Sequence, residues 1–137
     1  MTYLVDTNVL CESSKPEPND LVLEWLADND AELAVSSLTL GEMLKGIQLM
    51  DGGKRRSGIE KWYGRIEKWA TGRILPVDFA VCRTWAIFCA KHQRAGRKLP
   101  AMDSLIAAIA IHHQLTLVTR NAGDFPDDVA ILNPWEE

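Results

Sequence analysis

The sequence predicts an α/β fold in which a central, mostly parallel β-sheet is flanked by α-helices. Short apolar runs of the length of buried strands alternate with longer segments whose apolar residues recur at helical spacing. One of the longer segments, 104–113, is apolar almost all round, which is typical of a buried helix. The chain shows no internal repeat, low-complexity tract or linker, so we expect one domain over residues 1–137.

Two strands and three helices are predicted in the first half of the chain. The strand at 2–5 runs directly into Asp6, and Pro16 and Pro18 break the chain after it. A second strand is expected at 32–36. Apolar residues at i, i+3 and i+4 predict amphipathic helices at 21–26, at 38–50 with its end at Gly52-Gly53, and at 54–70, where the apolar residues lie at 59–70.

The second half continues the alternation of strands and helices. A short strand is expected at 74–77, and its Pro76 indicates a sheet edge or a strand end. The remaining predicted elements are a helix at 79–95 that ends near Gly96, the buried helix at 104–113, and strands at 116–119 and 129–132.

Four acidic residues fall where a predicted strand ends or a predicted helix begins: Asp6, Glu42, Asp103 and Asp124. Ligands of parallel sheets bind beyond the carboxyl ends of the strands, so we expect these carboxylates to gather at one pole. Gathered carboxylates repel one another and stay ionised together only with a positive charge between them. A hard divalent cation such as Mg²⁺ prefers such oxygen ligands and can activate water against a phosphodiester.

Each acid taken singly also has a structural explanation, and for a single residue that explanation is favoured. Four acids at the same pole are much harder to explain in this way. The structural alternatives are an Asx-turn at Asp6, a capping box of Thr39 with Glu42, N-capping by Asp103 after Pro100, and a loop position for Asp124.

Charge is distributed unevenly along the chain, although the net charge is only −4. Residues 1–53 carry ten acids and two bases, whereas residues 54–73 carry seven bases and two acids. Lys61, Arg65 and Lys68 lie on one face of the helix predicted at 59–70. This basic stripe is either a solvated helix face or a contact for the phosphates of RNA.

Three cysteines, an odd number without framework spacing, favour a reducing setting; they are Cys11, Cys82 and Cys89. No apolar run is long enough to span a bilayer, and the N-terminus lacks the basic and cleavage features of a signal peptide. We therefore expect a cytoplasmic protein with no membrane partner.

Several short motifs follow one another along nearly the whole chain. They are Leu4-Val5-Asp6-Thr7-Asn8-Val9, Ser36-Ser37-Leu38-Thr39-Leu40-Gly41-Glu42, Asp103-Ser104-Leu105-Ile106-Ala107-Ala108, and Thr119-Arg120-Asn121 with Asp124-Phe125. In order and spacing they resemble the PIN-domain family, and specifically VapC/FitB-type toxins of toxin–antitoxin pairs. Gly72-Arg73-Ile74-Leu75-Pro76 and Asn133-Pro134-Trp135 resemble the FitB-like branch.

The resemblance implies a PIN-like fold and RNA cleavage that depends on Mg²⁺ or Mn²⁺. The family's four acids correspond to Asp6, Glu42, Asp103 and Asp124. It also implies a homodimer, an antitoxin partner in a heterotetramer or larger assembly, and DNA binding only through that antitoxin. A basic antitoxin tail would enter the acidic pocket. Thr7, Asn8 and Thr119 are expected to orient water or carboxylates around the acids.

Two other classes of function are possible for the same residues. A phosphoryl-transfer enzyme or receiver would use Asp6 or a neighbour as the phosphorylated nucleophile, but Asn8 stands where a nucleophilic phosphatase would carry a second Asp. A catalytically weak PIN protein could instead act as a regulatory partner in a DNA-binding, FitAB-like complex. The presence of all four acids favours the nuclease.

Overall fold

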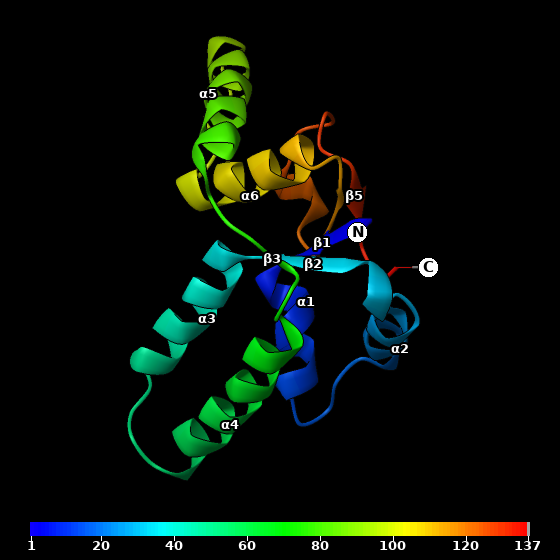
Figure 1. Ribbon diagram of the computed structural model, residues 1–137, viewed down its shortest axis with the longest axis vertical. Helices are drawn as coiled ribbons and strands as arrows, with labels where there is room; N and C mark the ends of the chain where they lie inside the picture. The colour runs from blue at the N-terminus through cyan, green and yellow to red at the C-terminus, as the bar shows by residue number, and fades with distance from the viewer. Residues whose placement is uncertain (137) are drawn as a thin grey trace.

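A computed structural model describes residues 1–136 and contains a five-stranded, entirely parallel sheet with helices on both faces (Figure 1). The α/β prediction is therefore confirmed. The order of the strands across the sheet is β3-β2-β1-β4-β5, which makes β1 the central strand. The strands span Tyr3–Val5 (β1), Leu33–Ser36 (β2), Ile74–Leu75 (β3), Thr116–Val118 (β4) and Ile131–Leu132 (β5).

Six α-helices and three short 3₁₀ helices connect the strands of the described chain. The α-helices span Thr7–Cys11 (α1), Asp20–Asp28 (α2), Ser37–Gln48 (α3), Lys54–Trp69 (α4), Phe79–Arg94 (α5) and Ala101–His112 (α6). The 3₁₀ helices span Glu12–Ser14 (η1), Asp30–Glu32 (η2) and Ala122–Asp124 (η3).

The central strands alternate their side chains between two separate cores. In the parallel register, Leu4 lies beside Ala34 and Leu117, and these three side chains face one side of the sheet. Val5 and its partners face the other side. Both faces of the sheet are covered, which explains why the strands read as continuous apolar runs.

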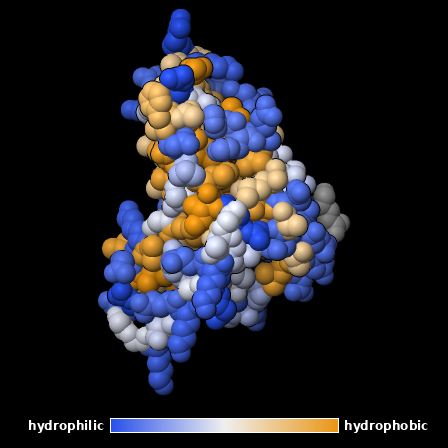
Figure 2. Space-filling view, viewed as in Figure 1, coloured by the Kyte–Doolittle hydropathy of each residue, from blue (hydrophilic) through white to orange (hydrophobic). Residues whose placement is uncertain are grey.

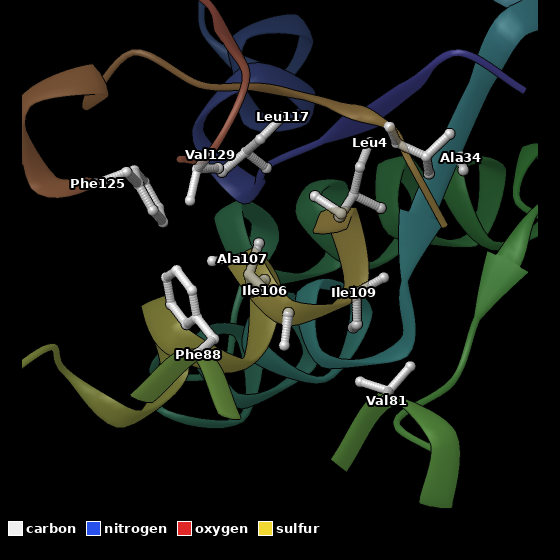
Figure 3. Close-up of a cluster of buried hydrophobic side chains, with 13 residues drawn as sticks. Leu4, Ala34, Val81, Phe88, Ile106, Ala107, Ile109, Leu117, Phe125 and Val129 are labelled. Atoms are coloured by element: carbon white, nitrogen blue, oxygen red, sulfur yellow. The ribbon is translucent and has the colours of Figure 1, made fainter. Parts of the chain in front are cut away.

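The first core is closed by α5 and α6, which Figure 1 shows together on one side of the sheet. Figure 3 shows Ile106, Ala107 and Ile109 of α6 between the strand residues and the side chains of α5. Phe88 and Phe125 close the outer end of this cluster. The apolar helix expected at 104–113 is thus found buried, with its start three residues earlier at Ala101.

The second core lies on the opposite face and is formed with α1, α2, α3 and α4. In Figure 1, α3 and α4 run side by side away from the sheet, with α1 next to α4. Tyr63 of α4 and Met43 of α3 are both buried in this core. The amphipathic patterns predicted for these helices are therefore satisfied by packing against one another and against α1.

Some element boundaries match those expected and others differ. Helix α4 spans Lys54–Trp69, within one residue of the predicted 54–70, and Gly53, with φ 134°, lies in the turn directly before it. Strand β3 ends before Pro76, but it does lie at the sheet edge as that proline indicated. Gly96, with φ 88°, follows the end of α5 as predicted.

Among residues 1–136, no helix combines the length and the apolar character needed to cross a bilayer. Hydrophobic residues are nevertheless visible at the surface, in a band across the middle of the face shown in Figure 2. Large side chains with more than a third of their area exposed include Leu44, Leu49, Ile74, Phe79, Ile87 and Met102.

Candidate active site

Asp6 lies at the carboxyl end of the central strand and caps the helix that follows. Its Oδ1 accepts a hydrogen bond of 2.8 Å from the Thr7 amide, and its Oδ2 accepts one of 3.0 Å from Thr119 Oγ1. The backbone amide of Asp6 also donates to the Val118 carbonyl at 2.9 Å. The carboxylate is therefore held on both oxygens, in a half-buried position between β1 and β4.

Thr119 is fully buried at the end of β4 and links Asp6 to Asn8. Its hydroxyl accepts hydrogen bonds of 3.2 Å from Asn8 Nδ2 and from the Asn121 amide, while donating to Asp6. Asn8 Oδ1 in turn accepts from the Arg120 amide at 3.2 Å. The ends of two neighbouring strands are thus joined by one polar network around the Asp6 carboxylate.

Glu42 projects from the second turn of α3, and Thr7 Oγ1 donates to its Oε1 at 3.1 Å. The capping box considered for Glu42 is wrong, because Ser36 caps α3 by accepting from the Leu38 amide. Thr39 lies inside the helix, fully buried, and its hydroxyl makes no hydrogen bond. Thr7 therefore contacts two acids, Asp6 through its amide and Glu42 through its hydroxyl.

Asp103 is half-buried in the first turn of α6. It is not the N-cap of this helix, because Pro100 occupies that position and the helix already starts at Ala101. Its place near the positive end of the helix still favours a negative charge. Asp124 ends η3 and is exposed, which matches the loop position considered for it.

The four carboxylates act on one another electrostatically. Burial raises the pKa of Glu42; the hydrogen bond from Thr7 lowers it, and the charges of Asp6 and Asp103 raise it further. Burial also raises the pKa of Asp103, to which the charges of Asp6 and Asp124 add. Each of the four predicted acids therefore acts on at least one other acid of the set, while the charge of Lys45 lowers the pKa of Glu42.

The donor chemistry of this region fits a hard divalent cation. All four side chains offer carboxylate oxygens. Burial is the main reason that the pKa values of Glu42 and Asp103 are raised, and a cation would offset the repulsion that adds to it. As the side chains of residues 1–136 are placed, however, no three His, Cys, Asp or Glu residues converge closely enough to hold one ion.

Sequence reasoning missed that Cys11, at the end of α1, lies near two of the acids. Burial raises the pKa of Cys11, which the charge of Lys15 lowers and the charges of Glu42 and Asp6 raise. The next residue, Glu12, is buried, accepts from the Asn19 amide at 2.8 Å and pairs with Lys15 at 2.9 Å. Predicting the short helix α1 after Asp6 would have placed Cys11 near the site.

The predicted basic stripe lies on the exposed side of α4. Lys61, Arg65 and Lys68 are all exposed, and none of them forms an ion pair within residues 1–136. Only Arg65 also lines a groove, which lies between α4 and the segment 13–16. Contact of the stripe with RNA stays a prediction.

Comparison with known proteins supports one family. The PIN domain family model, described as "PIN domain", matches residues 3–129. The chain is 36% identical to "Toxin FitB" of Neisseria gonorrhoeae, over 98% of this chain and 99% of that protein. It is 34% identical to "VapC ribonuclease Y4jK" of Sinorhizobium fredii, over 97% of each chain.

A solved structure extends this likeness to three dimensions. The structure titled "Structure of FitAB bound to IR36 DNA fragment" superposes with a TM-score of 0.91 at 35% identity, covering 99% of this chain and 97% of that one. Because the family model and these relatives span almost its entire length, the chain belongs to the PIN domain family, alongside FitB- and VapC-type toxins.

Proposed function

We propose that this protein is a single-domain endoribonuclease toxin that hydrolyses RNA phosphodiester bonds with Mg²⁺ or Mn²⁺. The observation that supports the proposal best is the electrostatic coupling of Asp6, Glu42, Asp103 and Asp124 at the carboxyl end of the sheet. Two curated relatives at 34% and 28% identity carry the word ribonuclease in their names. The toxin would act in the cytoplasm.

Asp6 and Asp103 would hold the cation, and Glu42 and Asp124 would complete its surroundings directly or through water. A bound divalent ion supplies a hydroxide at neutral pH and offsets charge on the phosphoryl oxygens. The protein's own contribution is orientation. Thr119 and the Thr7 amide fix both oxygens of Asp6, while the Thr7 hydroxyl fixes Glu42.

We further propose that an antitoxin blocks this site with an Arg or Lys on a flexible tail. A guanidinium would replace the cation and pair with a carboxylate through two hydrogen bonds. The toxin would dimerise through apolar surface on α3 and α4, where Leu44 and Leu49 are exposed, and each dimer would bind two tails. DNA would be bound through the antitoxin alone.

A second candidate function is that of a catalytically weak PIN protein serving as the regulatory partner in a DNA-binding complex. The observation that favours it is the likeness to FitAB, which was solved bound to a DNA fragment. The receiver hypothesis is weakened further, because the Asn8 side chain is already used in hydrogen bonds just after β4. Its Nδ2 donates to Thr119 Oγ1, and its Oδ1 accepts from the Arg120 amide.

The test is cleavage of a mixed RNA pool by the isolated chain, with and without Mn²⁺, using Asp103→Asn and Asp127→Asn. Both substitutions remove one negative charge, but Asp127 is an exposed residue outside the acidic region. We expect Asp103→Asn to lower cleavage by orders of magnitude and Asp127→Asn to leave it unchanged. Wild-type cleavage by Asp103→Asn would show that the site is assigned wrongly. Absence of metal-dependent cleavage by the wild type would favour the regulatory role.

A further inference from the structure

We propose that the groove between residues 13–16 and the part of α4 from Lys54 to Arg65 binds single-stranded RNA next to the cleavage site, an inference that rests on the proposed ribonuclease function. The groove has a volume of about 540 Å³. One wall is the turn that follows η1, and the other is the face of α4 from Lys54 to Arg65.

The groove is lined by positive charge. Lys54, Arg55 and Arg65 belong to its wall, and none of the three forms an ion pair within the described residues 1–136. A fourth cation, Lys15, is held on the opposite wall by its ion pair with the buried Glu12. No acidic side chain of the described chain lines the groove. Its charge therefore suits a ligand with several negative groups.

The start of α4 adds to this preference for anions. Gly53 is the N-cap of the helix and has no side chain to accept from the first backbone N–H groups. These donors, at the positive end of a 16-residue helix, lie in the same turn as Lys54 and Arg55.

The groove also has an apolar part, which distinguishes it from a site for a simple anion. Pro16, Ile59 and Trp62 line it together with the cations. The indole N–H of Trp62 donates to Ser13 Oγ at 2.9 Å, so the ring is tied to the opposite wall and held in place. Cationic side chains beside a fixed aromatic ring suit a nucleotide, with phosphates on the rim and a base on the indole.

The position of the groove relates it to the carboxylates. Helix α1 starts directly after Asp6, and η1 ends at Ser14 on the groove wall, roughly 13 Å further along the chain. The thiol of Cys11 lies between them and senses the charges of both Lys15 and Asp6, although burial is the main reason that its pKa is raised. RNA in the groove would therefore contact the protein beside the scissile phosphate.

The test compares two double variants in the full-length protein. Arg55→Ala/Arg65→Ala removes two charges from the groove, and Arg83→Ala/Arg94→Ala removes two exposed charges of α5 that do not line it. Binding of a fluorescein-labelled oligouridylate is measured in EDTA over a range of salt. We expect the groove variant to bind roughly tenfold more weakly, with a salt slope smaller by about 1.4. The control should stay within about twofold of wild type.

A second measurement tests the aromatic contact. Oligouridylate should quench the tryptophan fluorescence of the wild type and of Trp69→Phe, but much less that of Trp62→Phe. Trp69 is the matched control, because it lies on the same helix and bonds Asp30 outside the groove. Equal quenching in the two variants would show that no base stacks on Trp62.

The proposal fails if the groove and control variants lose RNA affinity equally, or if the groove variant binds RNA as wild type does. It also fails if the groove variant loses affinity only for an acidic protein partner, which would assign the groove to that partner. These outcomes differ from failure of the proposed function. RNA bound through the groove without metal-dependent cleavage would refute the ribonuclease and leave the groove in place.

Discussion

At the scale of single residues, two threonines control the orientation of two acids. Thr119 and Thr7 each donate a hydroxyl hydrogen bond to a carboxylate, to Asp6 and Glu42 respectively. Thr119 directly follows the last residue of β4, and Thr7 directly follows Asp6, the N-cap of α1. The backbone of each threonine is therefore fixed by the fold. Repulsion between the acids would otherwise turn these side chains outward to solvent.

We predict that Thr119→Val lowers cleavage roughly 10- to 100-fold through kcat rather than KM. Valine keeps the shape of threonine but removes the hydrogen bonds that the hydroxyl makes to Asp6, Asn8 and the Asn121 amide. The free energy of unfolding should also fall by about 1–3 kcal/mol, because buried polar groups lose their partner. Steady-state kinetics and urea denaturation measure the two effects.

Thr119→Ser is the control, since it retains the hydroxyl and should restore most of kcat. A Thr119→Val enzyme with wild-type kcat would show that the Asp6 carboxylate keeps its position without this bond.

The raised pKa values predict how stability depends on pH. Protonated Glu42 and Asp103 fit the folded state better than the ionised forms, because their pKa values are raised above 4.5 and 3.8. Their contribution to stability is therefore present at low pH and lost as pH rises through the raised values. Above the raised values the ionised carboxylates oppose folding, and Mn²⁺ should offset their repulsion.

We predict that Asp103→Asn unfolds at an equal or higher temperature than the wild type at pH 7 without metal. Mn²⁺ should raise the melting temperature of the wild type and raise that of Asp103→Asn much less. The pKa of Asp128 is shifted in the opposite direction. Burial raises it, but the hydrogen bonds from Lys91 and His92 together outweigh burial and lower it. Asp128→Asn should therefore melt lower at pH 7, and calorimetry that showed the same shift for both variants would contradict the assignment.

At the scale of elements, the apolar pattern predicted the strands and long helices but missed the short helix α1. Its five residues, Thr7–Cys11, span little more than one turn, which is too short for a helical period to show. Helix formation there depends on capping by Asp6 and on burial of Val9 and Leu10 in the second core. The contacts of Thr7 and Asn8 with the acids follow from this helix, so only their proximity could be expected from the sequence.

The predicted start of α4 at residue 54 is confirmed, although no apolar residue marks it. Residues 54–58 read Lys-Arg-Arg-Ser-Gly and contain no apolar residue to set a period. The helix nonetheless begins at Lys54, where Arg56 donates to the Met50 carbonyl at 3.0 Å and ties the first turn to the end of α3. Tertiary contacts of this kind leave no mark in the hydrophobic pattern.

The buried and exposed faces of α5 should contribute differently to the stability of the fold. Phe88 is 4% exposed and packs into the first core, whereas the adjacent Ile87 is 70% exposed. We predict that Phe88→Ala lowers the free energy of unfolding by about 3–5 kcal/mol and that Ile87→Ala changes it by less than about 0.5 kcal/mol. Chemical denaturation of both variants measures this difference, and similar losses would mean that Ile87 is covered in solution.

At the scale of the whole molecule, the order of the strands determines which acids meet. The sequence placed Asp6 and Asp124 after strands, but it could not show that β1 is central with β4 beside it. That order brings Thr119 to Asp6. The charge imbalance along the chain was visible in the sequence, whereas the position of Arg65 at a groove depended on the packing of α4 against α1 and η1.

The acidic region also determines how an inhibitor should respond to metal. If an antitoxin inserts an Arg between Asp6, Glu42 and Asp103, its guanidinium and the divalent cation compete for the same carboxylates. We therefore predict that the cognate antitoxin binds more tightly in EDTA than in excess Mn²⁺. In Asp103→Asn this difference in affinity should shrink, because the guanidinium and the cation both lose one carboxylate partner.

The measurement is isothermal titration calorimetry of wild type and Asp103→Asn at fixed ionic strength, so that general screening is the same in both buffers. Mg²⁺ in place of Mn²⁺ should have the same direction of effect. Equal antitoxin affinity in EDTA and in Mn²⁺ would show that the partner binds outside the acidic region. The antitoxin would then have to inhibit by blocking the binding of RNA. The groove along α4 would be the first surface to test, with Arg55→Ala/Arg65→Ala.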